Sequence, residues 1–257
     1  MRTFTRDRLT VKVYADRAEM GCGAGADIHA CLTRLLSEQA EVNMIFAAAP
    51  SQNETLAALL SYTDIDWTRV RAFHMDEYIG LPSDAPQRFG TYLREHIFGN
   101  APFASVEYID CASADRAAIE AECARYAALL REHPVDIVCL GIGENGHIAF
   151  NDPGVADFAD PVLIKPVPLD EVCRMQQVHD GCFARLSDVP THALTLTVPA
   201  LFAGRYLFCS VPAKTKANAV REMVTSDVIS EHCPCTILRR HANAVLYCDA
   251  DSGALLP

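Results

Sequence analysis

VDIVCLGIGENGHIAFNDPG, residues 135–154, joins a short apolar run to a turn rich in glycine and polar side chains. The run VDIVCL has the length and composition of a β-strand that is buried on both faces. Gly141, Gly143 and Gly146 allow the backbone after this strand to approach a ligand closely. We therefore expect a central strand that ends in a ligand-contacting loop.

The same alternation of apolar runs and helical patterns continues along the chain. Strands are expected at LTVKVYA, EVNMIFAAA, RVRAFHM, SVEYID, VDIVCLG, HALTLTV, RYLFCSV and NAVLYCDA, and helices over 15–38, 51–62, 86–98, 113–132 and 213–224. Apolar strands separated by helices predict an α/β, Rossmann-like fold whose mainly parallel sheet carries helices on both faces. No linker or shift of composition divides the chain, so we expect residues 1–257 to form a single domain.

The charge of the chain excludes some classes of partner. The formal net charge is -11, and no cluster of Lys and Arg is longer than a pair. This argues against binding to nucleic acid or to an anionic membrane surface. The start MRTFTRDRLTVKVY lacks the apolar core of a signal peptide, and no run of eighteen apolar residues occurs. We expect a cytoplasmic protein.

The 11 cysteines sit mostly in apolar, strand-like contexts, which is typical of reduced core residues. The exception is EHCPCTILRRH, where His232, Cys233, Cys235 and His241 are candidate ligands for a soft metal ion. The alternative is a helix-entry turn around Pro234. The C-x-C spacing, rather than C-x-x-C, favours the turn, and we expect no metal site.

Acid-base side chains follow two of the predicted strands. Asp76 and Glu77 come after RVRAF, where one carboxylate can face a ligand as a base while the other is held by hydrogen-bond donors. A solvated acidic turn is the alternative. His147 can transfer protons near neutral pH, and Asp152 can return to orient its ring. The alternative for His147 is a core histidine bonded to backbone. In parallel sheets such strand ends form the ligand site.

Two segments are candidates for binding an anion. In AAAPSQNET, Ser51 is expected as the N-cap of a helix, with Glu54 as its capping-box partner. In VPAKTKANAVREM, Lys214 and Lys216 lie at a predicted helix start, where a cation is unfavourable for the helix dipole. At least one lysine is therefore expected to have another task, such as holding a phosphate; solvated lysines are the alternative.

Together, FHMDEYIGLP, DIVCLGIGENGHIAFNDPG, HALTLTVPAL, the lysine-bearing helix and CTILRRHANAVLYCDADS resemble the glucosamine-6-phosphate deaminase family, in that order and across nearly the whole chain. The 6-phosphogluconolactonases of the same superfamily typically continue the histidine motif as A-S-L-F-P, so AFNDP favours the deaminase branch. The resemblance implies a deaminase of the hydrolase and isomerase type that converts glucosamine 6-phosphate to fructose 6-phosphate and ammonia. It implies a small-molecule sugar phosphate as partner and no redox cofactor or metal.

The resemblance also implies roles for individual residues. Asp76 matches the proton-transfer base and His147 the ring-opening histidine; Asn145 falls where the family has Asp or Asn, and Asp152 where it usually has Glu as the partner of the histidine. The residues expected to bind substrate are Ala49, Ser51, Gln52, Glu77, Gly146 and Lys216. The phosphate loop departs from the family, because AAAPSQN replaces a loop rich in Gly and Thr, and no matching arginine is found near QQVHDGCFARL.

Two alternatives stay open at this point. The protein could hydrolyse a sugar-phosphate lactone, with His147 activating water, or it could be a sugar-phosphate sensor without turnover. Release of ammonia separates the deaminase from both. The sequence leaves open the exact sugar, the need for its phosphate, allosteric regulation and assembly as a homo-oligomer.

Overall fold

The computed structural model describes residues 1–179 and 181–257. Its main sheet has eight strands in the order β1-β2-β11-β10-β7-β3-β4-β6, in which β1 and β2 pair antiparallel and all other neighbours are parallel. The fold is thus α/β with a mainly parallel sheet, as predicted. The strands are β1 Arg2–Arg6, β2 Leu9–Val13, β3 Val42–Phe46, β4 Val70–His74, β6 Ser105–Glu107, β7 Ile137–Leu140, β10 Tyr206–Val211 and β11 Ala244–Cys248.

Five helices lie in the predicted ranges, with irregular turns at several ends, whereas the helices Glu171–His179 and Val198–Phe202 were not predicted. The range 86–98 is a short α-helix continued by a π-helical turn, Arg94–Phe98, and the range 213–224 begins with a 3₁₀ turn, Lys214–Lys216. The α-helices are α1 Arg17–Glu38, α2 Asn53–Leu60, α3 Phe89–Leu93, α4 Arg116–Glu132, α5 Glu171–His179, α6 Val198–Phe202 and α7 Ala217–Thr225. No helix in this described part of the chain has both the length and the apolar character needed to cross a membrane.

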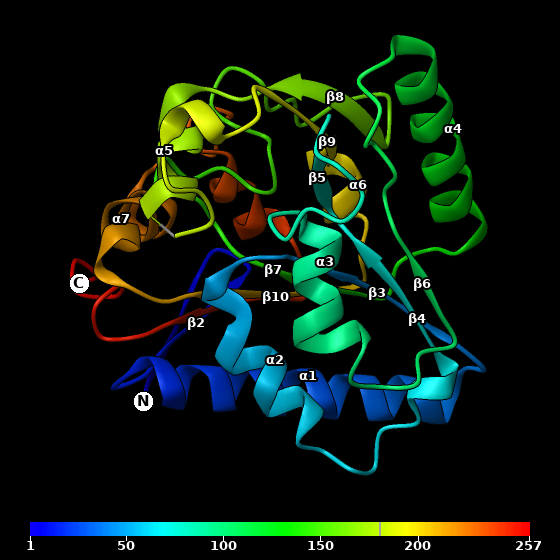
Figure 1. The fold of residues 1–257 in the computed structure, drawn as a ribbon. Coiled ribbons are helices and arrows are strands. Elements are labelled where there is room, and N and C mark those ends of the chain that lie inside the picture. Colours follow the sequence, from blue (N-terminus) through cyan, green and yellow to red (C-terminus); the bar gives the residue numbers. More distant parts are fainter. Residues whose placement is uncertain (180) are drawn as a thin grey trace.

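Alternate side chains of each central strand enter different cores. Ile137 and Cys139 of β7 pack in the cluster that contains the buried face of α1, whereas Val138 and Leu140 pack in the cluster that contains α4 and α7. Figure 1 shows α1 and α2 on one side of the main sheet and α4 on the other. This period of two, apolar on both faces, explains why the strand sequences are continuously hydrophobic.

A second, three-stranded antiparallel sheet corrects the predicted place of HALTLTV. The strand β9, His192–Leu196, pairs with β5, Asp76–Tyr78, and with β8, Ile164–Pro168, instead of joining the parallel sheet. The chain leaves β4 at Met75, whose carbonyl accepts a hydrogen bond from the backbone of Leu196. An apolar pattern fixes which face of a strand is buried, but it does not determine the neighbouring strand.

The strand order reverses between β3 and β7. From β3 the chain continues to β4 on one side, whereas from β7 it continues to β10 on the other. At such a switch point the loops leaving adjacent strands diverge and open a crevice at the carboxyl edge of the sheet. The loops after β3, β4, β7 and β10 all meet at this edge.

Candidate active site

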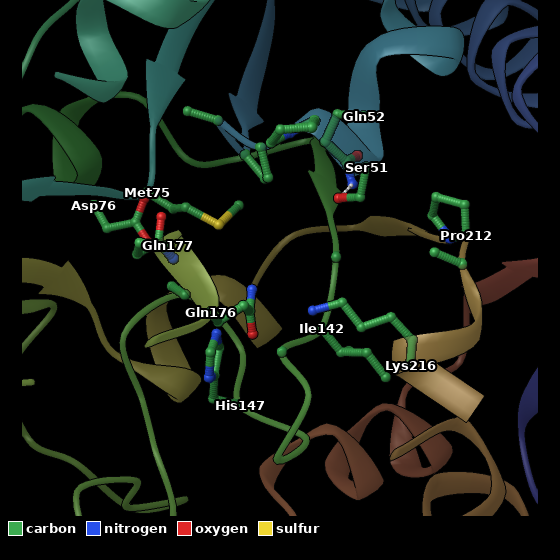
Figure 2. A pocket seen from close by; sticks show the side chains of 18 of the residues that line it. Ser51, Gln52, Met75, Asp76, Ile142, His147, Gln176, Gln177, Pro212 and Lys216 are labelled. Carbon is green, nitrogen blue, oxygen red and sulfur yellow. Dashed lines mark hydrogen bonds between the residues drawn. The ribbon is translucent and has the colours of Figure 1, made fainter. Parts of the chain in front are cut away.

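A cavity lies at this switch point. It contains about 850 Å³ of space, its solvent-open mouth included. Its walls come from the ends of β3, β4, β7 and β10, from α5 and from the start of α1. The lining residues of the predicted site are Ala49, Ser51, Gln52, Asp76, His147 and Lys216. Figure 2 shows Asp76, His147 and Lys216 reaching toward the cavity from three different segments.

Asp76 is held at the cavity wall by a buried histidine. The backbone amide of Ile109 donates to Nε2 of His74 at 2.8 Å, so Nδ1 carries the proton and donates to the carbonyl of Asp76 at 2.9 Å. Burial lowers the pKa of His74 to about 3, which keeps the ring neutral. His74 thus positions the backbone of Asp76 without itself lining the cavity.

Burial, with a smaller contribution from the neighbouring charge of Glu77, raises the pKa of Asp76 well above its usual value. A carboxylate with a raised pKa is a stronger base once it is ionised. The side chain is little exposed yet belongs to the cavity wall, so a bound ligand can reach it. Asp76 is therefore suited to accept a proton from a ligand.

The structure does not bring Glu77 into the cavity. Its carboxylate accepts hydrogen bonds from the backbone amides of Tyr78, Phe89 and Gly90, each at 3.0 Å, and lies 3.3 Å from Nε of Arg88. Burial raises the pKa of Glu77, although these donors and the guanidinium oppose that shift. The two adjacent carboxylates therefore divide labour: Asp76 faces the ligand space, and Glu77 anchors α3 to β5.

His147, Asp152 and Asn145 form one hydrogen-bonded unit. Nδ1 of His147 lies 2.9 Å from Oδ1 of Asp152, which also accepts from Nδ2 of Asn145 at 2.9 Å. The amide oxygen of Asn145 accepts from the backbone amide of His147 at 3.1 Å. Asp152 and Asn145 do not line the cavity. They orient the imidazole, whose Nε2 is left for a ligand.

Burial alone would raise the pKa of Asp152, but hydrogen bonds from His147 and Asn145, and the charge on the ring, hold it below the usual value. The carboxylate therefore stays ionised and favours the proton on Nδ1. In this tautomer Nε2 carries the lone pair that can accept a proton from a ligand. Although Asp152 is one methylene shorter than a glutamate, its carboxylate reaches the ring of His147 directly, with no bridging group.

Gly143 provides the space for the ring. A Cβ atom built on Gly143 would lie 2.1 Å from Cε1 and 2.4 Å from Nε2 of His147. The imidazole therefore packs directly over the backbone of the loop. Gly146 has a different task, because its φ of +83° favours glycine and it packs against Cys233 outside the cavity.

We expect Gly143→Ala to lower kcat by at least about 10-fold, because a displacement of an acid-base group by about 1 Å lowers the rate by up to ~10²-fold. The added methyl group must push the ring of His147 away from its present place. Steady-state kinetics and thermal unfolding, measured together, check this. Gly154→Ala is the control: its φ of +88° makes alanine strained, but nothing lies within 4 Å of the new Cβ. Gly154→Ala should cost stability and leave kcat near wild type; an equal loss of kcat in both variants would contradict the role of Gly143.

The predicted helix cap at Ser51 is wrong. Residues Pro50–Gln52 form a 3₁₀ turn, α2 follows it without a side-chain cap, and Glu54 pairs with Nε of Arg17 at 2.7 Å instead. The hydroxyl of Ser51 accepts from Nε2 of Gln52 at 3.0 Å. The helix α1 packs beside α2 and so places the guanidinium of Arg17 next to Glu54, which the local sequence pattern could not reveal. Ser51, Gln52 and Ala49 still line the cavity.

Two cations reach the cavity, and sequence reasoning found one of them. Lys216 is buried and lines the cavity, whereas Lys214 is exposed. Arg17, at the start of α1, also lines the cavity and donates to the carbonyl of Pro50. Gln176 and Gln177 of α5 complete the polar wall and were likewise not predicted. No motif marks these three residues, because only the packing of α1 and α5 places them there.

The segment EHCPCTILRRH forms the predicted turn. Pro234 begins a 3₁₀ helix, Pro234–Arg240. Sγ of Cys233 and Sγ of Cys235 lie 3.5 Å apart, and the amide of Cys235 donates to the carbonyl of Gly146 at 2.9 Å. Both ring nitrogens of His241 bond to backbone groups. The segment thus supports the loop that carries His147.

These features define an α/β enzyme with a paired carboxylate and imidazole at the carboxyl edge of a parallel sheet. The profile of the family described as glucosamine-6-phosphate isomerases/6-phosphogluconolactonase matches residues 15–247. The chain belongs to this family.

Relatives of known name agree with this membership. A glucosamine-6-phosphate deaminase of Listeria innocua is 34% identical over 216 residues, which cover 84% of this chain and 88% of the relative. One of Bacillus cereus is 35% identical over 191 residues, 74% of this chain and 70% of the relative.

Solved structures agree on the fold. The chain resembles a monomeric glucosamine-6-phosphate deaminase with a TM-score of 0.85 and 25% identity, covering 95% of this chain and 99% of the other. It also resembles the 6-phosphogluconolactonase of Trypanosoma brucei, with a TM-score of 0.79, 18% identity and full coverage of both chains. At that identity the second likeness concerns the fold alone.

Proposed function

We propose that the protein converts glucosamine 6-phosphate and water to fructose 6-phosphate and ammonia. The observation that supports this most directly is that Asp76 and His147 line the same cavity and that Asp152 contacts the ring of His147. An aldose-to-ketose conversion needs two separate proton transfers, one at the ring oxygens and one at C2. The cavity offers one base for each. The names of the similar deaminases support the same choice of substrate.

In the proposed reaction, His147 accepts the proton of the anomeric hydroxyl through Nε2 and delivers it to the ring oxygen, which opens the sugar. Asp76 then removes the proton from C2, and the electron pair forms an enolate at O1, which takes a proton from solvent to give the enol. Asp76 returns its proton to C1, and the amino group loses a proton to solvent as the C2 imine forms. Water hydrolyses the imine, which leaves the ketose and ammonia. Asp152 stabilises the imidazolium while His147 carries the proton.

We propose that Lys216 and Arg17 hold the phosphate, assisted by the hydroxyl groups of Ser51 and Thr215, all of which line the cavity. In Figure 2, Ser51 and Lys216 lie on the opposite side of the view from Asp76 and His147. This arrangement leaves the sugar carbons between the phosphate and the acid-base pair. Because the loop 47–52 contains no glycine, side chains rather than backbone amides supply most of the proposed contacts.

We expect Lys216→Ala to raise KM for glucosamine 6-phosphate by about 10 to 150-fold, since a charge-assisted contact contributes roughly 1.5–3 kcal/mol. The loss should fall on substrate binding more than on kcat. Lys214→Ala is the matched control, because Lys214 is two residues away on the same turn but exposed; its KM should stay close to wild type. Equal activity on glucosamine and glucosamine 6-phosphate would rule out a phosphate site.

Ammonia release from a panel of amino-sugar phosphates tests the proposed function directly. Glucosamine 6-phosphate should give ammonia and fructose 6-phosphate in equal amounts. Acid release from 6-phosphogluconolactone without ammonia from any amino sugar would favour a lactonase. A lactonase would also tolerate Asp76→Asn, because lactone hydrolysis needs no C2 base. We propose that the enzyme is cytoplasmic, since most of its eleven cysteines sit in apolar, strand-like contexts that are typical of reduced core residues.

A further inference from the structure

Behind the imidazole of His147, three different ligand types converge. The side chains of His147, Asp152 and Cys173 are all buried, and a nitrogen, an oxygen and a sulfur atom from them lie within 4.8 Å of one another. From this geometry we propose that these three residues bind a zinc ion, or a similar transition-metal ion, and that the bound ion inhibits the enzyme. The inhibition rests on the proposed function, whereas the metal site does not.

The three ligands come from two parts of the fold. His147 and Asp152 belong to the loop after β7, where their ligand atoms are 2.9 Å apart. Cys173 lies in the first turn of α5, and its backbone amide donates to Oδ1 of Asp170 at 2.6 Å. Ligand atoms around tetrahedral zinc are separated by roughly 3.3–3.6 Å. The three ligand atoms lie within 4.8 Å of one another, which is within about 1.5 Å of this geometry.

The charges of the site also fit a divalent cation. With Asp152 as carboxylate and Cys173 as thiolate, a doubly charged ion is neutralised, so its burial is not opposed by net charge. Oδ2 of Asp152 is buried, and it can serve as a second carboxylate ligand. Water from the cavity can occupy a remaining position.

The surroundings of Cys173 favour a bound cation. The carboxylates of Asp152 and Asp170 both lie close to this residue. The same carboxylates attract a positive ion, and coordination removes the thiol proton, which leaves as a single proton per ion bound. A nitrogen and a sulfur ligand select zinc or cobalt over magnesium or calcium.

Metal binding would reverse the useful tautomer of His147. Coordination requires the lone pair of Nδ1, so the ring proton must reside on Nε2, the atom that faces the ligand space. His147 then cannot accept a proton from the substrate. The carboxylate of Asp152, bound to the ion, also no longer stabilises the imidazolium. The same three side chains thus couple the reaction to the concentration of free zinc.

Cobalt(II) is the direct probe of the site, because thiolate coordination gives a charge-transfer band in the near ultraviolet. Wild-type protein should bind one cobalt ion with this band. Cys173→Ser should abolish the band, and Asp152→Asn should weaken binding by at least about 10-fold. Cys235→Ser, which removes one of two thiols that lie 3.5 Å apart, should keep the band. A band that survives in Cys173→Ser, or disappears in Cys235→Ser, would overturn the site.

Ammonia release in zinc-buffered solution tests the inhibition. Zinc should stop turnover of the wild type reversibly, with recovery after a chelator is added. The zinc concentration for half-inhibition should rise at least about 10-fold in Cys173→Ser, and stay unchanged in Cys235→Ser and in Cys22→Ser, whose thiol is exposed. Each variant is compared with its own zinc-free rate. Equal inhibition of Cys173→Ser and wild type would refute the proposal. If no ammonia is formed at all, the cobalt spectra still decide the metal site.

Discussion

Asp76→Asn should reduce kcat for glucosamine 6-phosphate by at least ~10²-fold, the lower range for loss of a positioned general base. Asparagine keeps the shape of the side chain but cannot accept the C2 proton. Because His74 holds the backbone carbonyl of residue 76, the substituted side chain should stay at the cavity wall. The measurement is the rate of ammonia release together with exchange of the C2 hydrogen for deuterium from solvent. Exchange at the wild-type rate in the variant would show that another group is the base.

The pH dependence of the wild type, compared with that of Asp76→Asn, separates the effect of Asp76 on activity from its effect on stability. The pKa of Asp76 is raised in the folded protein, so the folded state binds this proton more tightly than the unfolded state. The stabilisation by the proton is therefore present below the unfolded pKa and is lost as pH rises through the folded pKa. Activity should rise over the same interval, because the carboxylate is the active form.

Above the folded pKa of Asp76, Asp76→Asn should be more stable than the wild type, since it buries no charge next to Glu77. Urea unfolding of both proteins across the acid-to-neutral range checks the sign. The difference in the free energy of unfolding should favour the variant increasingly as pH rises. If the wild type instead becomes more stable than Asp76→Asn as pH rises, then Asp76 is not a buried carboxylate that lacks a compensating charge.

His147→Gln and Asp152→Asn should each impair turnover, and the double variant should be little worse than His147→Gln. A general base contributes about 10²–10⁴-fold, and residues that act as one unit are strongly non-additive. The structural basis is the contact of 2.9 Å between Nδ1 and Oδ1. Once the imidazole is absent, Asp152 has no ring to orient. A double-mutant cycle on kcat measures this coupling.

The same cycle on an open-chain substrate analogue identifies the step. If His147 opens the ring, an analogue that is already open should suffer a smaller penalty in His147→Gln than glucosamine 6-phosphate does. Asp76→Asn should be equally harmful with both substrates, because C2 deprotonation follows ring opening. Multiplicative losses in the double variant, or the same penalty on both substrates in His147→Gln, would contradict the pairing.

Local patterns in the sequence determined most of the architecture. Strands such as VDIVCL are apolar at every position because both of their faces are covered, and this pattern is readable without a structure. The glycine-bracketed His147 and the carboxylate at Asp76 were likewise readable, since few structural roles need such residues directly after a buried strand. For the same reason the deaminase family could be recognised from these two segments.

Only the tertiary structure decided which polar groups share the cavity. Glu77 and Asp76 are adjacent in sequence, but their side chains lie on opposite sides of β5. Glu77 accepts hydrogen bonds from the amides of α3, whereas Asp76 lines the cavity. Arg17 reaches the site only because α1 packs beside α2, and Cys173 meets Asp152 only because α5 begins near the loop after β7. Sequence periodicity specifies burial along one element. Contacts between distant elements depend on strand order and helix packing, and no local pattern encodes these.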